Sequence, residues 1–352
     1  MFLHTIVYIL AFFGAKVIFM NDTKPTAKER FKRVLDLSSE VLTSKELKYA
    51  LKRILLSLLT IFAVITITFF AMHAIPGGPF QAEKAISAEA EAALREKYGL
   101  DKPIIVQYFT YLKDVFIKFD FGPSLKQKGR NCTEIIFDGL KVSARLGVFA
   151  AFSALIFGIT LGALAAVKKD SYADRVIMVF TTALVSMPSF IMGTVLLTFF
   201  SIKLGWFPAS LSVETGIRGY FLPIITLSLY PLAYITRLTR SSMLDVLGQD
   251  YIRTAKAKGV SRFGIVFRHA IKNSLLPVIT YFGPMLAYIV TGSLVVEKIF
   301  AVGGIGRDFI GSITNRDYPL IMGTTIVLSV LVIFMNLLSD MLYRLADPRI
   351  SV

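Results

Sequence analysis

The sequence has almost no side chains suited to metal or redox chemistry. Among 352 residues it holds one cysteine, Cys132, and three histidines, His4, His73 and His269. A single cysteine cannot form an internal disulfide, and the histidines lie too far apart to form a Cys/His cluster with metal-ligand spacing. We therefore expect no metal, no redox centre and no cofactor in this chain.

Motifs for nucleotide hydrolysis and peptide-bond cleavage are also missing. No Gly-x-x-x-x-Gly-Lys-Ser/Thr sequence occurs, and the glycine-rich segment 303–307 has the wrong spacing for a phosphate-binding loop. Gly-x-Ser-x-Gly, His-Glu-x-x-His and a paired membrane aspartate arrangement are absent too. These absences predict that the chain is not an enzyme and does not itself hydrolyse ATP.

Charged residues are scarce and apolar residues abundant. Charged side chains make up 18% of the chain, hydrophobic ones 55%, and the mean hydropathy is +0.64. This composition departs from that of soluble domains and is typical of an integral membrane protein. We expect an all-α polytopic membrane protein, because only helices or closed barrels satisfy their backbone groups in lipid.

Six apolar runs approach the length of about 20 residues that a helix needs to cross a bilayer. They lie near residues 54–75, 146–167, 176–200, 220–237, 275–296 and 320–343. The fourth is short and contains Pro223 and Pro231, which should kink it.

A seventh apolar run, residues 2–20, precedes these six. It lacks the basic start and small-residue cleavage pattern of a signal peptide. We expect an extra membrane helix, with a segment lying in the membrane interface as the alternative. The N-terminal extension, 1–53, would then combine this helix with a basic cytoplasmic segment.

The formal net charge of +15 raises the possibility of nucleic-acid binding, but the placement of the charges disfavours it. Residues 21–53 hold nine Lys/Arg against five acids, and residues 237–272 hold eight against two. Residues 76–142 are nearly balanced, at ten against nine. An excess in alternate loops is the positive-inside pattern, which places 76–142 outside and 237–272 in the cytoplasm.

The outer segment, 76–140, is too long and too polar to be a simple connector. Residues 87–99 read as a helix capped by Ser87 and stopped by Gly99, and residues 103–119 as a second helix. On the second helix an apolar face is expected to pack. It comprises Ile105, Tyr108, Phe109, Leu112 and Phe116.

A polar insert, 242–272, follows the fourth predicted span. We expect a helix from Ser242 to Lys258, a chain reversal at Gly259, and a second helix capped by Ser261 and continuing through Lys272. One side of this insert carries only the small side chains of alanines and Gly259, and basic residues surround that side. Physical reasoning leaves two roles open: docking into a groove of a partner protein, or lying on anionic lipid headgroups.

Residues 250–277 resemble the signature loop of permeases in binding-protein-dependent ABC importers, in the form found in the oligopeptide and dipeptide permease family. This sequence has Arg253-Thr254-Ala255 and Gly259, followed by 269–272 and, only later, Pro277. The general importer pattern has Glu-Ala-Ala where this sequence has Arg253-Thr254-Ala255, and its Leu-Pro lies closer to the glycine than Pro277 does here. The departures are typical of the peptide subfamily.

Short motifs in the same order support this resemblance over about residues 50–349. Gly303 is a departure, because the family usually has proline there. The matching segments are 74–79, 99–103 with 107–108, 120–124, 187–190, 205–208, 304–306, 316–319 and 347–349.

The resemblance implies a six-helix type I ABC importer permease core in a bacterial plasma (inner) membrane. The core would comprise the first span and residues 141–345, with 346–352 as a cytoplasmic tail. Implied partners are a second, homologous permease subunit, two ATPase subunits that hold ATP and Mg, and an extracytoplasmic substrate-binding protein. The implied cargo is an oligopeptide or dipeptide; nickel chelates, glutathione or haem are alternatives within the family.

The resemblance assigns docking on an ATPase subunit to ten residues of the insert. They are Asp250, Tyr251, Arg253, Thr254, Ala255, Lys256, Lys258, Gly259, Arg268 and His269. An ion-coupled secondary transporter is the main rival class. The middles of the predicted spans contain no Asp, Glu, Lys or Arg, which disfavours ion coupling.

Overall fold

The computed structural model describes residues 44–346, apart from 77, 81–87, 213 and 291–293. This part of the chain is helical, with one isolated bridge between Pro123 and Asn131. It divides into two compact units, Met1–Ala63 and Val64–Val352, each considered by itself below. The predicted helix over 2–20, the rest of the extension to residue 43 and the tail from 347 lie outside the described residues.

Helix α3 (Ser44–Ala74) covers the first predicted span, 54–75, except for its last residue. Its part in the first unit ends at Ala63, and its last eleven residues belong to the second unit. The window Leu51–Ala74 has a mean hydropathy of 2.6. An apolar helix of this length is long enough to cross a bilayer.

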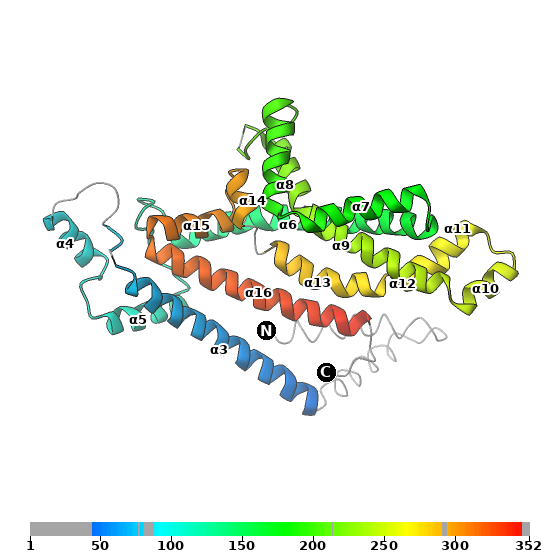
Figure 1. Cartoon of the computed structure of the whole chain (residues 1–352). Coiled ribbons are helices and arrows are strands. Elements are labelled where there is room, and N and C mark those ends of the chain that lie inside the picture. Colours follow the sequence, from blue (N-terminus) through cyan, green and yellow to red (C-terminus); the bar gives the residue numbers. More distant parts are fainter. Residues whose placement is uncertain (1–43, 77, 81–87, 213, 291–293, 347–352) are drawn as a thin grey trace, which may run out of the picture. The chain divides into compact units, whose positions relative to one another are not determined.

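The larger unit contains the remaining candidate spans (Figure 1). Across the described residues, five helices are long and apolar enough to cross a membrane, or six if one bent pair forms a single span. In the larger unit the main helices are α6 (Cys132–Val167), α7 (Tyr172–Ser186), α8 (Ser189–Leu196), α9 (Phe221–Leu247), α13 (Leu276–Val290), α14 (Leu294–Ile299), α15 (Ile305–Asn315) and α16 (Tyr318–Ala346).

Helix α6 begins well before the predicted residue 146. Its cap is Asn131, whose side chain accepts a hydrogen bond from the Thr133 amide at 2.8 Å. Counting apolar residues locates the part of a helix that suits lipid, and it misses a polar first portion. The outer segment therefore ends in the first turns of α6.

The predicted span over 176–200 is two helices and not one. Helix α7 ends at Ser186, α8 begins at Ser189, and a π-helical turn (Leu197–Lys203) continues α8; the two parts meet at 107°. The cause is Pro188, which lacks an amide proton and pushes Met187 into the extended conformation seen there. Figure 1 shows α8 turning away from α7.

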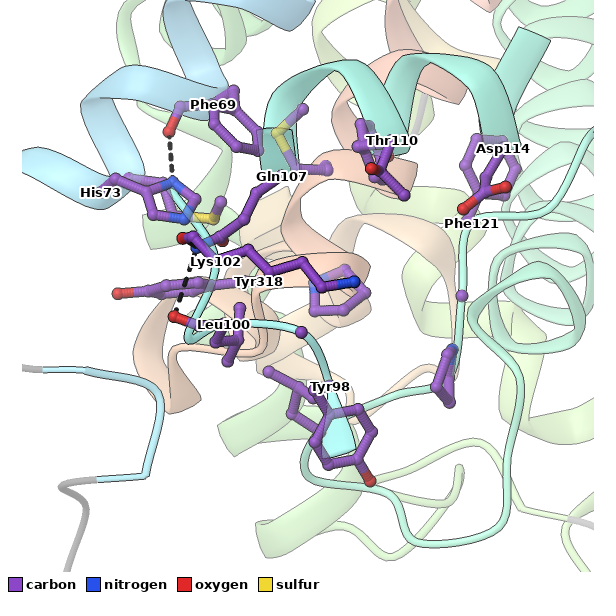
Figure 2. A pocket seen from close by; sticks show the side chains of 18 of the residues that line it. Phe69, His73, Tyr98, Leu100, Lys102, Gln107, Thr110, Asp114, Phe121 and Tyr318 are labelled. Atoms are coloured by element: carbon purple, nitrogen blue, oxygen red, sulfur yellow. Dashed lines mark hydrogen bonds between the residues drawn. The ribbon is translucent and has the colours of Figure 1, made fainter. Parts of the chain in front are cut away.

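The outer segment contains the two predicted helices, α4 (Ala88–Lys97) and α5 (Ile104–Lys113), and α5 continues in a π-helical turn (Asp114–Lys118). Gly99 has the left-handed φ of 65° expected where a helix stops. Gln107 holds the connection between these helices, because its Nε2 donates to the carbonyl of Lys102 at 2.7 Å and of Leu100 at 3.3 Å (Figure 2).

The prediction of which side of α5 packs against the rest of the protein is wrong. Tyr108 is buried, but Ile105, Phe109 and Phe116 are at least half exposed. The buried line continues from Tyr108 to Val115, seven residues on, because the Tyr108 side chain lies against Phe69 and hydrogen-bonds Thr66 at 2.7 Å. In a membrane protein, apolar side chains also face lipid, so hydrophobicity alone does not identify the packing side.

Helix α6 is the centre of the larger unit, and four of its glycines lie against other backbones. A Cβ on Gly162 would lie 2.5 Å from the Thr236 carbonyl oxygen of α9, and one on Gly147 would lie 2.9 Å from Val290 Cα of α13. Gly158 meets α9 and Gly139 meets the start of α15 in the same way. Small residues spaced four apart allow such close approach of helices in lipid.

A fully buried carboxylate, Glu297, fastens the outer end of α6 to α15. Glu297 accepts hydrogen bonds from the Ser143 hydroxyl at 2.7 Å and from the Arg307 amide at 3.1 Å. Ser143 in turn accepts from the amide of Ile305 at 3.0 Å. A Cβ on Gly304 would lie 2.3 Å from Glu297, so this glycine is required for the carboxylate to reach the helix start.

We expect the substitution Gly162→Ala to destabilise the protein by about 1–3 kcal/mol, because the Thr236 backbone cannot move away from the added methyl group. Gly311→Ala is the matched control: this helical glycine has no heavy atom within 4 Å of the added Cβ, and alanine should stabilise the helix by up to about 1 kcal/mol. Unfolding of the purified protein in detergent measures both. Equal effects would contradict the close contact of α6 and α9.

Candidate functional site

The polar insert does not begin as one helix from Ser242 to Lys258, as the sequence suggested. Helix α9 ends at Leu247, and α10 (Asp250–Ala257) starts after Gly248 and Gln249, the latter in an extended conformation. Asp250 favours a new helix start, since an acidic residue in the first turn meets the positive end of the helix dipole. The chain therefore bends before the predicted reversal.

The predicted reversal at Gly259 is confirmed, and its hydrogen bonds are those of a Schellman cap. The Gly259 amide donates to the Lys256 carbonyl at 3.0 Å, and the Val260 amide to the Ala255 carbonyl at 3.2 Å. Gly259 has a φ of 76°, a conformation that proline cannot adopt and alanine adopts at a cost. This residue sets the direction of the chain beyond α10.

The second part of the insert is helical from Arg262 to Ser274, in three contiguous pieces. They are α11 (Arg262–Gly264), a π-helical turn (Ile265–Ala270) and α12 (Ile271–Ser274). Ser261 caps it as predicted, because its hydroxyl accepts from the Gly264 amide at 3.2 Å. Residues 250–274 are called the hook below.

Eight of the ten predicted docking residues are exposed on the hook. They are Asp250, Tyr251, Arg253, Thr254, Lys256, Lys258, Gly259 and Arg268. Asp250 and Arg253 form an exposed ion pair at 3.5 Å, and the Tyr251 hydroxyl accepts from Asn273 at 3.0 Å, which ties the two arms of the hook together. The His269 side chain is half-buried.

Ala255 faces inward, with an exposed fraction of 9%, next to the fully buried Ile252 on the same side of α10. Its small size serves the packing of α10 within the hook. A surface available to a partner is therefore formed by the opposite, charged side of α10 and by the second arm. Sequence alone could not distinguish an alanine that faces a partner from one that faces the chain itself.

Two exposed aromatic side chains on the second arm escaped the sequence analysis. Phe263 is 71% exposed and Phe267 57% exposed, and their ring centroids lie 4.3 Å apart. The spacing of four residues places both rings on one side of the arm. A paired apolar surface among basic residues is typical of a protein contact and could have been recognised from this spacing.

The hook has a core that it shares with two membrane helices. Ala270 of the hook is fully buried with Met243 of α9 and Ala166 near the end of α6. Val266 and Ile271 of the hook pack against the same cluster. A force applied to the hook therefore reaches the ends of α6 and α9 through side chains that are already in contact.

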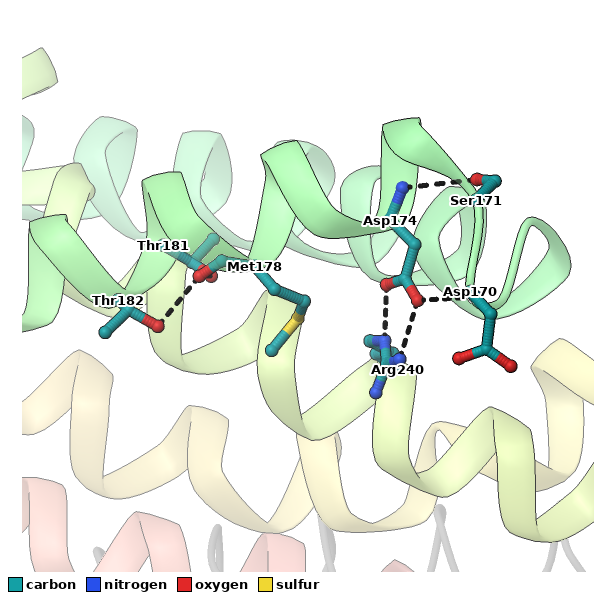
Figure 3. A network of polar contacts seen from close by, with 7 residues as sticks. All are labelled: Asp170, Ser171, Asp174, Met178, Thr181, Thr182 and Arg240. Atoms are coloured by element: carbon teal, nitrogen blue, oxygen red, sulfur yellow. Dashed lines mark hydrogen bonds and ion pairs between the residues drawn. The ribbon is translucent and has the colours of Figure 1, made fainter.

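An ion pair between the buried Asp174 and the partly exposed Arg240 joins α7 to α9 close to this core (Figure 3). Arg240 donates through Nε and one terminal nitrogen to the two carboxylate oxygens of Asp174, both at 2.7 Å. The Asp174 side chain is 4% exposed, and its carboxylate also accepts from the Asp170 amide at 3.0 Å. Such a two-pronged pair fixes the orientation of both helices.

Comparison with known proteins covers nearly the whole chain. Residues 158–352 match the family model "Binding-protein-dependent transport system inner membrane component", and residues 46–139 match the model of the N-terminal part of such membrane components. A dipeptide transport system permease protein of Bacillus subtilis is 45% identical over 87% of this chain and 98% of its own length.

Two further relatives agree. An oligopeptide transport system permease protein of Haemophilus influenzae is 42% identical over 86% of this chain and 99% of its own length. The corresponding protein of Escherichia coli is 41% identical, with the same coverage. The chain therefore belongs to the family of binding-protein-dependent transport system inner membrane components.

Proposed function

We propose that this chain is a permease subunit of an ATP-driven importer of dipeptides or oligopeptides, that it forms half of the translocation pathway, and that its hook docks on a cytoplasmic ATPase subunit. The observation that carries the proposal is the similarity, over 86–87% of this chain, to permeases named for dipeptide and oligopeptide transport. The hook, two helical arms joined by a chain reversal, supports the proposal because its exposed side offers a separate ATPase subunit a surface to bind.

The proposed partners are a second, homologous permease subunit, two ATPase subunits and an extracytoplasmic substrate-binding protein. ATP and Mg would be held by the ATPase subunits. On the hook, Phe263 and Phe267 would fill an apolar groove, and Arg253, Lys256, Lys258 and Arg268 would meet acidic residues around it. The same basic surface alone would suit anionic lipid, but the paired aromatic side chains favour a protein groove.

Coupling would proceed through the core beneath the hook. When the ATPase subunits close, the hook moves, and Ala270 carries Met243 of α9 and Ala166 of α6 with it. The ion pair between Arg240 and Asp174 passes the movement to α7. A rigid-body shift of packed helices is a common way to switch a pathway between its two openings.

The proposed function is tested by purifying the chain with its co-purifying subunits and reconstituting them in vesicles. We expect uptake of a labelled peptide that needs ATP and the binding protein and persists when an ionophore removes the ion gradients. Uptake driven by an ion gradient without ATP would contradict it and favour the secondary transporter.

Replacement of both Phe263 and Phe267 by serine should lower peptide-stimulated ATPase activity by about tenfold or more, because an apolar anchor in a desolvated groove contributes about 2 kcal/mol or more to binding. Phe116→Ser is a matched control, since Phe116 is similarly exposed on the outer segment. Unchanged stimulation with intact subunit association would exclude these rings from docking.

Gly259→Pro should uncouple the ATPase subunits from transport while leaving membrane insertion intact, because proline cannot adopt the φ of 76° that reverses the hook. Gly205→Pro is a control, at a positive φ of 64° in a loop outside the hook. The measurement is substrate-dependent ATPase activity of reconstituted complexes. Normal stimulation in Gly259→Pro would rule out the hook as the coupling element.

Arg240→Met should destabilise the protein by about 1–3 kcal/mol, because it leaves the buried Asp174 carboxylate without its partner. Asp174→Leu should destabilise it less, because the Arg240 side chain is 22% exposed and its guanidinium can reach water. The double variant should be less destabilised than the sum of the two, because both charges are then removed. Unfolding in detergent gives the four values of this cycle. Simple additivity would mean that the pair contributes nothing to holding α7 on α9.

A further inference from the structure

Helix α9 belongs to one of the candidate membrane spans, yet its exposed side between residues 222 and 247 is polar. The exposed residues follow one another at spacings of three or four, which places them on one line along the helix. The apolar side chains of the same stretch are all buried or partly buried. The line, called the α9 stripe below, consists of Tyr230, Tyr234, Arg237, Ser241 and Asp245.

The neighbouring span α6 exposes the opposite kind of surface at the same level. A Cβ on Gly158 of α6 would lie 3.1 Å from the Leu232 carbonyl oxygen of α9, so these two positions are level with each other. An apolar side suits lipid or another apolar helix, and a polar side at this level does not. The exposed side chains of α6 close to Gly158 are apolar and at least half exposed: Phe152, Ile156 and Phe157.

Helix α13, which lies beside α9 (Figure 1), adds two tyrosines to this surface. The ring centroids of Tyr234 and Tyr281 lie 4.3 Å apart, so α13 meets the α9 stripe there. Tyr288 lies seven residues after Tyr281, on the same side of α13, and is 81% exposed. The surface therefore continues along α13, away from the hook.

A belt of tyrosines at the membrane surface would have a different arrangement. Such a belt lies at the level of the lipid headgroups, on each side of the bilayer. From Tyr281 to Tyr288 the chain rises about 10 Å, and from Tyr234 to Tyr230 about 6 Å in the same direction, away from the hook. The hydroxyls are thus distributed along the spans and do not mark one membrane surface.

We propose that the α9 stripe, together with Tyr281 and Tyr288, is the wall that this chain contributes to a water-filled translocation pathway. The proposal rests on the proposed function for the existence of a pathway, and it assigns the residues that line it. Polar side chains within a membrane span face a water-filled cavity or other protein groups and avoid lipid.

The chemistry of this wall suits polar cargo in transit. A tyrosine hydroxyl both donates and accepts hydrogen bonds, so it can replace water around a solute without preferring one sign of charge. Nearer the hook, Arg237 and Asp245 add one charge of each sign. The outer part of the wall is therefore neutral, and charge selection by this chain is confined to the end of α9 next to the hook.

The test is the rate at which single cysteines react with a permanently charged methanethiosulfonate reagent. The chain and its co-purifying subunits are placed in lipid nanodiscs, which leave both membrane sides open, and the fully buried Cys132 is replaced by alanine. We expect Tyr230→Cys and Tyr288→Cys to react about tenfold or more faster than Phe157→Cys, because the reactive thiolate forms only in contact with water.

Phe157→Cys is the matched control, since Phe157 directly precedes Gly158 and is at least as exposed as Tyr230. Slow reaction at Tyr230→Cys and Tyr288→Cys would overturn the proposal, because lipid or a partner subunit would then cover the wall. Equally fast reaction at Phe157→Cys would overturn it too, since the two sides would then not differ in their contact with water.

A second comparison keeps Cys132 and does not depend on thiol chemistry. Tyr230→Lys should leave the amount of membrane-inserted complex unchanged, because the added charge reaches water. Phe157→Lys should lower that amount about tenfold or more, since a charge that faces lipid within a span is costly. Equal losses in the two variants would contradict the proposed wall.

These measurements need no transport, so they are separate from the test of the proposed function. Fast reaction at Tyr230→Cys combined with uptake driven by an ion gradient would reject the ATP-driven importer and keep the wall. ATP-driven uptake combined with slow reaction at both tyrosine positions would reject the wall and keep the importer.

Discussion

The close approach of α6 to its neighbours is the constraint on which the rest of the larger unit depends. Lipid removes the hydrophobic driving force between helices, so association relies on tight packing and hydrogen bonds. Glycines on α6 let the backbones of α9, α13 and α15 come within contact distance at different heights. A side chain at Gly162 or Gly147 would collide with the facing backbone and push these helices apart.

The two ends of α6 contact different parts of the larger unit. At its outer end, Gly139 and Ser143 meet α15, with the fully buried Glu297 as the shared acceptor. At its other end, Gly162 meets α9, and Ala166 belongs to the core beneath the hook. One helix thus connects the hook to the outer part of the same unit, as a coupled transporter requires.

Much of the fold could be predicted from the sequence because the signals were local. Apolar runs located the helices that can cross a membrane, and Gly259 and Gly99 marked chain reversals that only a left-handed residue allows. The motifs at 120–124 and 316–319 were recognised separately. In the structure the Ser124 hydroxyl and the Leu125 amide donate to the Asp317 carboxylate, so the two motifs lie in contact.

The sequence by itself determined the class of protein, most of the long apolar helices in the described residues and the position of the hook, since hydropathy, charge asymmetry and turn residues act within a few positions of the chain. Tertiary structure decided which side of each helix is covered. It turned Ala255 inward, left Phe263 and Phe267 exposed, and buried Glu297 against Ser143, 154 positions away. In a membrane, an apolar side chain can face either a neighbouring helix or the lipid, so only the packed structure shows which side of a helix is covered.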